Sequence, residues 1–377
     1  MRQKIRVLHI AQAAGGVDCY IRMLLKYLDK EKFENILICS QDFCETDYAN
    51  LVLSFKQIKL TREIDLNDLK AIVIIRKLIK KYNPDIVYAH SSKAGAITRV
   101  AKIGLKNYCV YNPHGWAFNM RCSVKKKMLY TAIEKIAALF CDKIICISDA
   151  EKQSALKKRI CCEDKLQVIF NGVDIEAYRN KAHGEVKRES LNIPQDAFVV
   201  GMVGRISPQK APEIFIKMAR LVKNKIPEAH FIIVGNGEQK ALIEKYAAEH
   251  GFLESLHITG WVNNSISYIE LFDVACLLSR WEGFGLALPE YMMVGKPIIA
   301  TNIDAIPNLI SNGKNGLLVP VDDETAACEA VFKIFSDKAM AARLTSEATS
   351  VVLEKYNSKR VASEHAVLFE MLVKKRG

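Results

Sequence analysis

The sequence contains no run of about 18 consecutive apolar residues, the length that an α-helix needs to cross a bilayer. It therefore predicts no transmembrane helix. The N-terminal stretch MRQKIRVLHIA is basic and then apolar, as in a signal peptide, but its apolar part is too short for one. We interpret this stretch as the entry into a first buried strand.

Cysteine pairs with the spacing of a metal site or a disulfide framework are also missing. The chain has eleven cysteines, an odd number, and no C-x-x-C motif. Cys161 and Cys162 are adjacent, and Cys141 and Cys146 lie five positions apart. These spacings fit neither a zinc site nor a disulfide framework. We expect reduced thiols in a cytoplasmic protein, where cysteine serves as a small core residue.

Three motifs that hold nucleotides or metals are absent as well. Gly235 and Gly237 resemble the start of a G-x-G-x-x-G motif, but Lys240 occupies the place of the third glycine. No G-x-x-x-x-G-K-[S/T] loop occurs, which excludes a Walker-type phosphate loop. No two aspartates are separated by a single residue, so the Asp-x-Asp pair with which many enzymes hold a divalent metal is missing. We therefore expect no metal cofactor.

Positive charge is in excess, with a formal net charge of +12. Such a balance indicates an anionic partner, which could be nucleic acid, an acidic membrane surface or phosphate groups. Three basic runs contribute to it and all lie in the first half of the chain: Arg76-Lys77 with Lys80-Lys81, Arg121 with Lys125–Lys127, and Lys157–Arg159.

Apolar strand-like runs alternate with amphipathic stretches along the whole chain. This pattern predicts an α/β fold with parallel sheets that carry helices on both faces. The predicted strands are Ile5–Ala11, Asn35–Gln41, Asp85–His90, Tyr108–His114, Lys143–Ser148, Leu166–Phe170, Phe198–Val203, His230–Val234, Leu256–Ile258, Asp273–Leu278, Pro297–Ala300 and Leu317–Val319. The predicted helices include Cys19–Leu28, Leu69–Lys81, Lys126–Phe140, Ala211–Lys223, Glu238–Glu249, Ile266–Leu271, Leu286–Val294 and Thr325–Phe335.

The alternation starts twice, which predicts two doubly wound Rossmann-like domains in tandem with a cleft between them. A chain of 377 residues is also long for one core. We place the first domain at residues 1–178, a polar linker at Tyr178–Arg188 and the second domain at residues 189–358. The tail, about residues 359–377, has a helical pattern.

The stretch Ser279–Glu290, SRWEGFGLALPE, follows a buried strand-like run and opens a helix. Backbone N–H groups and the positive end of the helix dipole would face a bound anion there. Glu282 and Glu290 would repel a phosphate, but a carboxylate accepts hydrogen bonds from hydroxyl groups. A sugar nucleotide carries both chemical groups. The candidate binding residues of this stretch are Glu282, Gly283, Phe284, Gly285, Leu286 and Glu290.

A second candidate site is the stretch Gly204–Lys210, GRISPQK, which lies between a predicted strand and a helix that opens near Pro212. Arg205 and Lys210 flank this helix N-terminus, where cations oppose the helix dipole unless an anion lies between them. Further candidates at the ends of predicted strands are Gly15, Gly16, His114, Gly204, Gly235 and Val262.

Together these motifs resemble the retaining glycosyltransferases of family 4. Glu282 and Glu290 match the family's E-x7-E motif, and GRISPQK looks like its phosphate-binding loop. The NGVD turn near the domain boundary, the HGW segment and the Gly15-Gly16 loop are similar as well. One departure is Ala211, which stands where the family commonly has glycine after the lysine.

The resemblance implies a GT-B fold with an N-terminal acceptor domain, a C-terminal donor domain and a last helix that returns to the first domain. It implies Arg205 and Lys210 on the donor diphosphate and Glu290 on the ribose. The donor sugar would contact Glu282 and the amides of Gly283, Phe284 and Gly285, with His114 near the reacting centre. Gly15 and Gly16 would let the diphosphate or the acceptor approach. The implied catalytic residues are His114, Glu282, Arg205 and Lys210.

The implied reaction is metal-independent transfer of a sugar, with retention, from a nucleotide sugar that we expect to be a UDP-sugar. The implied acceptor is a saccharide, expected to be linked to a polyprenyl diphosphate, as in capsule or exopolysaccharide assembly. We expect a cytoplasmic enzyme that sits peripherally on the anionic inner face of the plasma membrane and does not bind nucleic acid.

Two alternatives remain open from the sequence. A UDP-sugar epimerase could use the same two-domain fold and would change its substrate without an acceptor. A basic nucleic-acid-binding protein would also explain the net charge, but it predicts aromatic residues interleaved with the basic ones on one face. The basic runs here have aliphatic neighbours instead.

Overall fold

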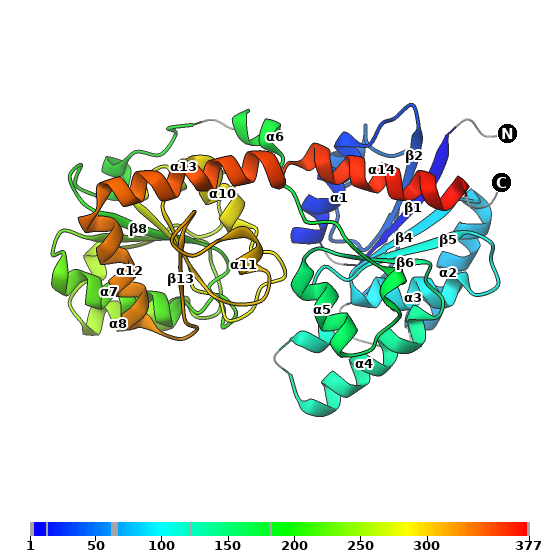
Figure 1. The fold of residues 1–377 in the computed structure, drawn as a ribbon, viewed down its shortest axis with the longest axis horizontal. Helices are drawn as coiled ribbons and strands as arrows, with labels where there is room; N and C mark the ends of the chain where they lie inside the picture. Colours follow the sequence, from blue (N-terminus) through cyan, green and yellow to red (C-terminus); the bar gives the residue numbers. More distant parts are fainter. Residues whose placement is uncertain (1–3, 13, 62–66, 121, 181–182, 375–377) are drawn as a thin grey trace. The chain divides into compact units, whose positions relative to one another are not determined.

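The computed structural model describes residues 4–12, 14–61, 67–120, 122–180 and 183–374. The chain divides into two compact units (Figure 1). The first unit consists of Met1–Gly172 and Ser358–Gly377, and the second consists of Val173–Asn357. Arg121 of a predicted basic run, residues 181–182 of the predicted linker and residues 375–377 of the predicted tail helix lie outside the described residues.

The first unit is built on a seven-stranded parallel sheet in the order β3-β2-β1-β4-β5-β6-β7. Its strands are β1 Ile5–Ala11, β2 Phe33–Cys39, β3 Ser54–Gln57, β4 Ile86–His90, β5 Tyr108–Asn112, β6 Lys143–Cys146 and β7 Leu166–Val168. Its helices are α1 Gly16–Tyr27, α2 Asn67–Tyr82, α3 Ser92–Lys102, α4 Val124–Ala138, α5 Asp149–Lys157 and α14 Ser358–Lys374.

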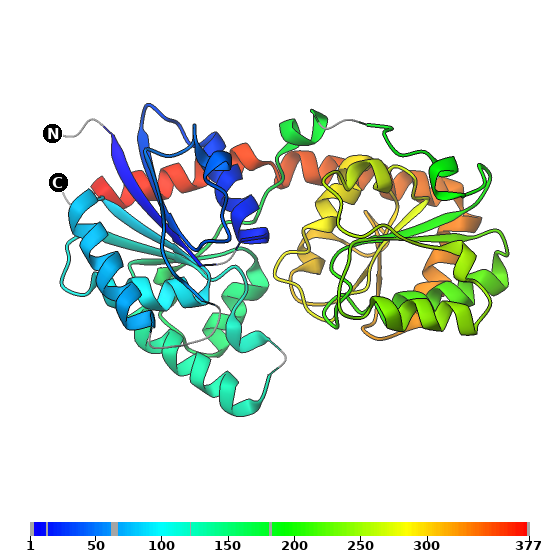
Figure 2. The same cartoon turned by 180° about the vertical axis from the view of Figure 1, so that it is seen from behind.

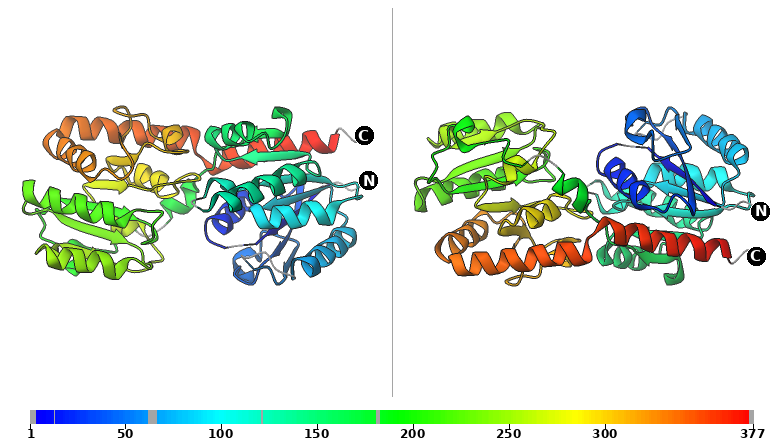
Figure 3. Two further views of the ribbon diagram at one scale, coloured as in Figure 1. Left: turned by 90° about the horizontal axis from the view of Figure 1, so that it is seen from below. Right: turned by 90° about the horizontal axis from the view of Figure 1, so that it is seen from above.

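Helices cover both faces of this sheet (Figure 3). On one face, Leu24 of α1 and Leu368 of α14 share a core with Tyr88 of β4. On the other face, Ile75 of α2 and Ile97 of α3 pack against alternate residues of β1. The sequence of β1, IRVLHIA, is nearly all apolar because a parallel strand is buried on both faces. The last helix thus completes the core of the first unit (Figure 2).

The second unit is built on a six-stranded parallel sheet in the order β10-β9-β8-β11-β12-β13. Its strands are β8 Val199–Val203, β9 His230–Val234, β10 Leu256–Ile258, β11 Val274–Leu277, β12 Ile298–Thr301 and β13 Leu317–Val319. Its helices are α6 Ile175–Arg179, α7 Pro212–Lys225, α8 Lys240–Glu249, α9 Ile266–Ile269, α10 Ala287–Val294, α11 Ile306–Leu309, α12 Glu324–Ser336 and α13 Lys338–Lys355.

The predicted fold class and all twelve predicted strands are confirmed, with bounds that shift by a few residues. The prediction missed β3, which lies at the sheet edge and is only partly buried, so its sequence SFKQ lacks an apolar run. No disulfide joins any of the eleven cysteines, all of which lie in the described residues, and six of them are buried: Cys39, Cys109, Cys141, Cys146, Cys276 and Cys328. No helix in the described part of the chain combines the length and apolar character needed to span a bilayer.

The predicted linker is wrong. The chain passes between the units at Gly172–Val173 and again at Asn357–Ser358. The described residues of Tyr178–Arg188 belong to the second unit, because Glu270 binds them there. Its carboxylate accepts a hydrogen bond from the Gly184 N–H at 2.8 Å and contacts the His183 ring at 2.5 Å.

Candidate functional site

The candidate residues of the second unit lie where its strand order reverses. The sheet grows outward from β8 in one direction and from β11 in the other, so β8 and β11 form the switch point. In doubly wound sheets, ligands bind beyond the carboxyl ends of the strands at this point. The stretch Gly204–Lys210 leaves β8, and Ser279–Gly285 leaves β11. The fold therefore brings the two predicted loops to one place.

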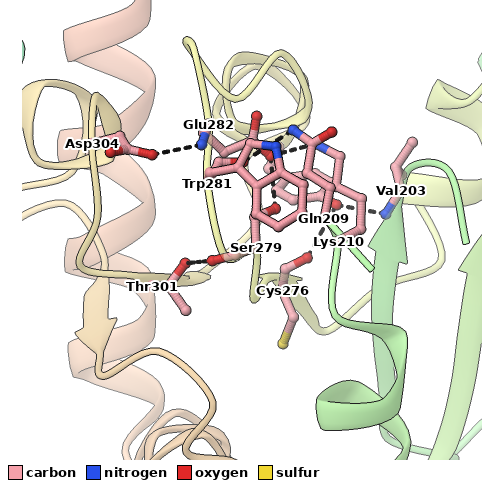
Figure 4. A network of polar contacts seen from close by, with 10 residues as sticks. Val203, Gln209, Lys210, Cys276, Ser279, Trp281, Glu282, Thr301 and Asp304 are labelled. Atoms are coloured by element: carbon pink, nitrogen blue, oxygen red, sulfur yellow. Dashed lines mark hydrogen bonds and ion pairs between the residues drawn. The ribbon is translucent and has the colours of Figure 1, made fainter. Parts of the chain in front are cut away.

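Lys210 and Glu282 connect the two loops (Figure 4). The Lys210 ammonium forms an ion pair with Glu282 Oε1, and the Ser279 hydroxyl donates to the same oxygen at 2.7 Å. The exposed fractions of the two charged side chains are only 16% and 6%. A charge-assisted contact of this kind is stronger when water is excluded. That both loops contact one small ligand stays a prediction.

A layer of hydrogen bonds holds the Glu282 loop in place. Asp304 Oδ2 accepts from the Glu282 backbone N–H at 2.9 Å, and the Thr301 hydroxyl donates to the Ser279 carbonyl at 2.6 Å. The Gln209 amide donates to the Trp281 carbonyl at 3.0 Å (Figure 4). None of these supporting contacts was predicted, since they join loops that are distant in sequence. Their effect is to fix the carboxylate before a ligand arrives.

Arg280 is a functional candidate that the sequence motifs did not indicate. Its guanidinium pairs with Glu213 at 2.6 Å and with Asp322 at 2.6 Å, and it donates to the Pro208 carbonyl at 3.0 Å. Arg280 therefore ties the loop after β11 to the loop after β8. Its cationic charge is neutralised by two carboxylates, so its role is positioning.

Glycine is required where the loops after β8 and β9 cross. A Cβ atom on Gly235 would lie 2.0 Å from the Gly204 carbonyl oxygen, which no side chain tolerates. Gly204 itself has a φ of 154°, and a Cβ there would meet the Lys210 side chain at 3.3 Å. Gly235 thus shapes the loop that carries Lys210. A direct ligand contact of Gly204 or Gly235 stays a prediction.

Ala211, the departure from the family pattern, adopts the left-handed conformation that favours glycine. Its φ is 48° and its ψ is 51°, and it is the N-cap of α7, directly before Pro212. The left-handed region costs a non-glycine residue about 1–2 kcal/mol. The turn after Lys210 therefore keeps the glycine-like backbone although the residue is alanine.

Three of the remaining predicted residues of the second unit have side-chain contacts in the structure, and the others are identified by their position in the fold. Phe284 is buried and packs against Tyr356 at a ring-centroid distance of 5.7 Å, so its side chain anchors the loop. Glu290 lies in the first turn of α10, where it accepts from the Ser265 hydroxyl at 3.0 Å. Arg205 is exposed and lies 3.3 Å from Glu238. The others lie in loops or at a helix end: Gly283, Gly285 with a φ of 78°, Leu286 as the α10 N-cap, and Val262 after β10.

Tyr291 connects the two strands that form the switch point. Its hydroxyl accepts from the Val203 N–H at 2.7 Å and donates to the Cys276 carbonyl at 3.3 Å, which joins the ends of β8 and β11. Burial raises the pKa of Tyr291 well above 10, so the phenol stays neutral. The spacing of the two strand ends, and with it the distance between the two loops, depends on this residue.

The first unit carries its predicted residues at the same end of its own sheet. Gly15, with a φ of 96°, is the N-cap of α1, and Gly16 is the first residue of that helix; both are exposed. His114 follows β5 with a φ of 50°, and its N–H donates to Asn112 Oδ1 at 2.9 Å. Burial lowers the pKa of His114 to about 3, so its ring is neutral near pH 7.

Glu151 supports the segment that contains His114. Its carboxylate accepts from the Ile147 N–H at 2.9 Å, and its carbonyl accepts from the Trp116 indole at 3.0 Å. Ser148, the N-cap of α5, accepts from the Glu151 N–H at 3.1 Å. Burial raises the pKa of Glu151 to about 7. In the described residues, no group of three His, Cys, Asp or Glu side chains is placed to hold a metal.

Two family models match the chain. The model for Glycosyltransferase Family 4 matches residues 14–177, and the model for Glycosyl transferases group 1 matches residues 184–351. A curated relative in Escherichia coli is UDP-Gal:alpha-D-GlcNAc-diphosphoundecaprenol alpha-1,3-galactosyltransferase, which is 32% identical over 346 residues and 89% of each chain. The Staphylococcus aureus capsular polysaccharide biosynthesis glycosyltransferase CapM is 24% identical over 380 residues and 98% of each chain.

Solved structures share the fold. A crystal structure of Anabaena Alr3699/HepE in complex with UDP has a TM-score of 0.83 and 19% identity, over 97% of this chain and 100% of that one. Sucrose-phosphate synthase from Thermosynechococcus elongatus has a TM-score of 0.84 and 18% identity, over 99% and 100%. With the family matches over both units, these similarities establish that the chain is a glycosyltransferase of family 4 with the GT-B fold.

Proposed function

We propose that this protein transfers a galactosyl residue from UDP-galactose, with retention, to an N-acetylglucosamine that is linked through diphosphate to a polyprenyl lipid. The Lys210–Glu282 contact at the switch point carries the proposal, because it joins a cation for phosphate to a carboxylate for sugar hydroxyls. The Escherichia coli relative, whose name states this donor and acceptor, supports the choice of substrates.

The second unit supplies the donor chemistry in this proposal. Negative charge builds on the departing nucleoside diphosphate, and Arg205 and Lys210 stabilise it without a divalent metal. An ammonium group has three N–H donors, so Lys210 can keep its contact with Glu282 and still reach a phosphate. Glu282 and the amides of Gly283–Gly285 then bind the sugar, and Glu290 binds the ribose hydroxyls.

The first unit supplies a neutral surface beside the reacting sugar. His114 contacts the sugar, and the exposed Gly15-Gly16 turn leaves room for the acceptor or the diphosphate. We propose front-face attack, in which the departing phosphate removes the proton of the acceptor hydroxyl and the anomeric configuration is kept. The anomer of the product, read by NMR of the purified disaccharide lipid, tests this step.

Helix α4 supports attachment to a membrane that carries the acceptor. Several of its exposed side chains are apolar, and its buried residues are Glu134, Ala137 and Ala138. The exposed apolar residues, with their exposed fractions, are Val124 73%, Met128 68%, Leu129 52%, Ile136 62% and Leu139 74%. Four lysines lie among them: Lys125, Lys126, Lys127 and Lys135. Aliphatic side chains mixed with lysines fit an anionic bilayer surface.

The test is a transfer assay with synthetic N-acetylglucosamine diphospholipid and a panel of UDP-sugars and other nucleotide sugars. We expect a disaccharide lipid only with UDP-galactose, and unchanged yield in excess EDTA. Incubation of the donor alone distinguishes an epimerase, which would convert UDP-galactose to an isomer without acceptor. Isomer formation, or preferred use of a different donor, would contradict the proposal.

A further inference from the structure

Three imidazole rings form a hydrogen-bonded chain inside the first unit. His9 Nδ1 lies 3.1 Å from His90 Nε2, and His90 Nδ1 lies 3.1 Å from His114 Nε2. At the far end, His9 Nε2 lies 3.2 Å from the amide oxygen of Asn35. His9 and His90 are fully buried, and Asn35 is nearly so. The chain thus runs from the interior of the sheet to the partly exposed His114.

The strand order creates this chain. His9 lies on β1, Asn35 on β2 and His90 at the end of β4, which are adjacent strands in register. His114 follows β5, the next strand. The rings of His9 and His90 are stacked at 5.4 Å, and those of His90 and His114 also at 5.4 Å. The rings are therefore held parallel as well as hydrogen-bonded.

With the Asn35 amide oxygen turned toward His9, neutral rings leave the three histidines only one arrangement of protons. A neutral imidazole carries one N–H and one lone pair. The Asn35 oxygen accepts, so His9 must donate from Nε2, which leaves its Nδ1 as an acceptor. His90 then donates from Nε2 to His9 and accepts at Nδ1 from His114. Burial lowers the pKa of His9 to about 4 and that of His90 well below 6.5, which keeps both rings neutral.

We infer that Asn35, His9 and His90 are positioning residues that hold His114 as the Nε2–H tautomer and present its Nδ1 lone pair to the transferred sugar. His114 Nδ1 has no hydrogen-bond partner among the described residues, and the residue is partly exposed. Tyr20 packs edge-on against the ring at 4.6 Å and limits its rotation. This inference rests on the proposed contact of His114 with the sugar.

A lone pair at this position selects among donors. It accepts a hydrogen bond from a sugar hydroxyl but cannot donate one to a phosphate or to an acceptor-only group. The sugar hydroxyl that faces His114 must therefore donate a hydrogen bond to Nδ1. A set of UDP-galactose analogues, each with one hydroxyl replaced by fluorine, identifies it. One analogue should lose about tenfold in kcat/KM, since fluorine cannot donate and the loss of one hydrogen bond has about this effect.

The direct test is a ¹⁵N spectrum of the full-length protein with labelled histidine, in which His114→Gln assigns the His114 signals. We expect a protonated Nε2 and an unprotonated Nδ1 for His114. In His90→Leu the two nitrogens should approach averaged values, and kcat/KM should fall about tenfold because the ring loses the bond that fixes it. In His90→Asn, whose side chain again accepts near the former Nδ1, the tautomer and most of the activity should return.

The matched control is His257→Leu in the second unit. It removes the hydrogen bond between two stacked imidazoles, His230 Nδ1 to His257 Nε2 at 2.9 Å. Both residues are distant from His114 in the sequence. Activity should stay within about twofold. A protonated His114 Nδ1 in the wild type, or an unchanged His114 spectrum in His90→Leu, would overturn the inference. The spectrum needs no substrate, so it decides the inference even if the transfer assay fails.

Discussion

The two units share the strand order of their first six strands but place different chemistry at the switch point. In the second unit, this edge carries charge, with Lys210 and Glu282 paired between the loops after β8 and β11. In the first unit, the same edge carries neutral rings, with His90 and His114 in contact. A doubly wound sheet thus fixes where a ligand binds, while the side chains on its loops decide which part of the substrate it receives. The charged edge suits a diphosphate and the neutral edge suits hydroxyl groups.

The largest effect is expected at the charged residues Lys210 and Glu282 of the second unit. Lys210→Met should lower kcat/KM by about 10²–10³-fold, because one group that stabilises the departing diphosphate is lost. The same change leaves the Glu282 carboxylate nearly buried without its cation, which costs about 3–5 kcal/mol of stability. Steady-state kinetics should therefore be measured at a temperature where circular dichroism shows the variant to be folded.

Two double variants separate catalysis from stability. Lys210→Met with Glu282→Leu removes both charges, so stability should return while transfer stays absent. The buried pair of the first unit, Arg99 Nη2 to Glu134 Oε2 at 2.8 Å, is the matched control. Arg99→Met with Glu134→Leu should leave kcat/KM within about threefold. Substantial transfer by the Lys210–Glu282 double variant would refute the assigned site.

The next effect concerns membrane binding, which we assign to the first unit. Replacing Met128, Leu129 and Ile136 with serine should lower binding to vesicles of phosphatidylglycerol by more than about tenfold, since each exposed aliphatic side chain contributes burial energy in the bilayer. The measurement is co-sedimentation with vesicles, with and without the anionic lipid.

A control of the same kind uses exposed apolar residues of the second unit. Leu242, Leu253 and Phe332 are exposed by 54%, 45% and 40%. Their replacement by serine should leave vesicle binding unchanged. If both triple variants bind as the wild type does, or if binding is indifferent to anionic lipid, α4 is not the attachment surface.

A third prediction concerns acid stability. Burial lowers the pKa of His9 and His365 to about 4 and that of His114 to about 3, below the ordinary 6.5. Their contribution to stability is present above pH 6.5 and is lost as the pH falls toward 4, because the unfolded chain binds protons first. Glu151 acts in the opposite direction between pH 4.5 and 7, since its pKa is raised to about 7. The histidines outnumber it, so the first unit should lose stability on acidification.

Tryptophan fluorescence can measure this in each unit. Trp116 is buried in the first unit, whereas Trp261 and Trp281 lie in the second. With Trp261→Phe and Trp281→Phe, urea unfolding followed by Trp116 should show a midpoint that falls between pH 6.5 and 4. The change should be smaller in His9→Gln. An identical pH dependence in that variant would exclude the histidine chain as the cause.

The smallest effect is expected at Ala211. Ala211→Gly relieves the left-handed strain but gives up a buried methyl group, worth about 0.8 kcal/mol, so stability should change by less than about 1 kcal/mol. Transfer activity should be kept, because the turn after Lys210 already has the backbone that glycine would adopt. Calorimetric unfolding and kinetics check both expectations, and a loss of activity would mean that the turn moves.

The sequence predicts those parts of the fold that depend on local pattern. The predicted strands Ile5–Ala11 and His230–Val234 have the bounds found in the structure, because strands buried on both faces are continuous apolar runs. The edge strand β3 and the position of the linker were missed. Both depend on partners distant in sequence, such as Glu270 for the predicted linker.

The sequence predicts which loops form the candidate site, but not the contacts between these loops. Glycines, cations and carboxylates after strands mark Lys210 and Glu282, but their mutual contact follows from strand order. Asp304 and Thr301 carry no motif and enter through the same assembly. His9 cannot be distinguished from a core residue in the sequence. Its position on β1, opposite Tyr88 of the strand that also carries His90, is a weak signal. The chemistry of the site thus depends on neighbours that a linear pattern does not identify.

Binding of UDP-galactose and of UDP, measured by titration calorimetry, tests the assigned donor site most directly. Lys210→Met should weaken both ligands, since they share the diphosphate, whereas Glu282→Gln should weaken UDP-galactose more than UDP, since only the former carries the sugar. Wild-type affinity of Lys210→Met for both ligands would contradict the account.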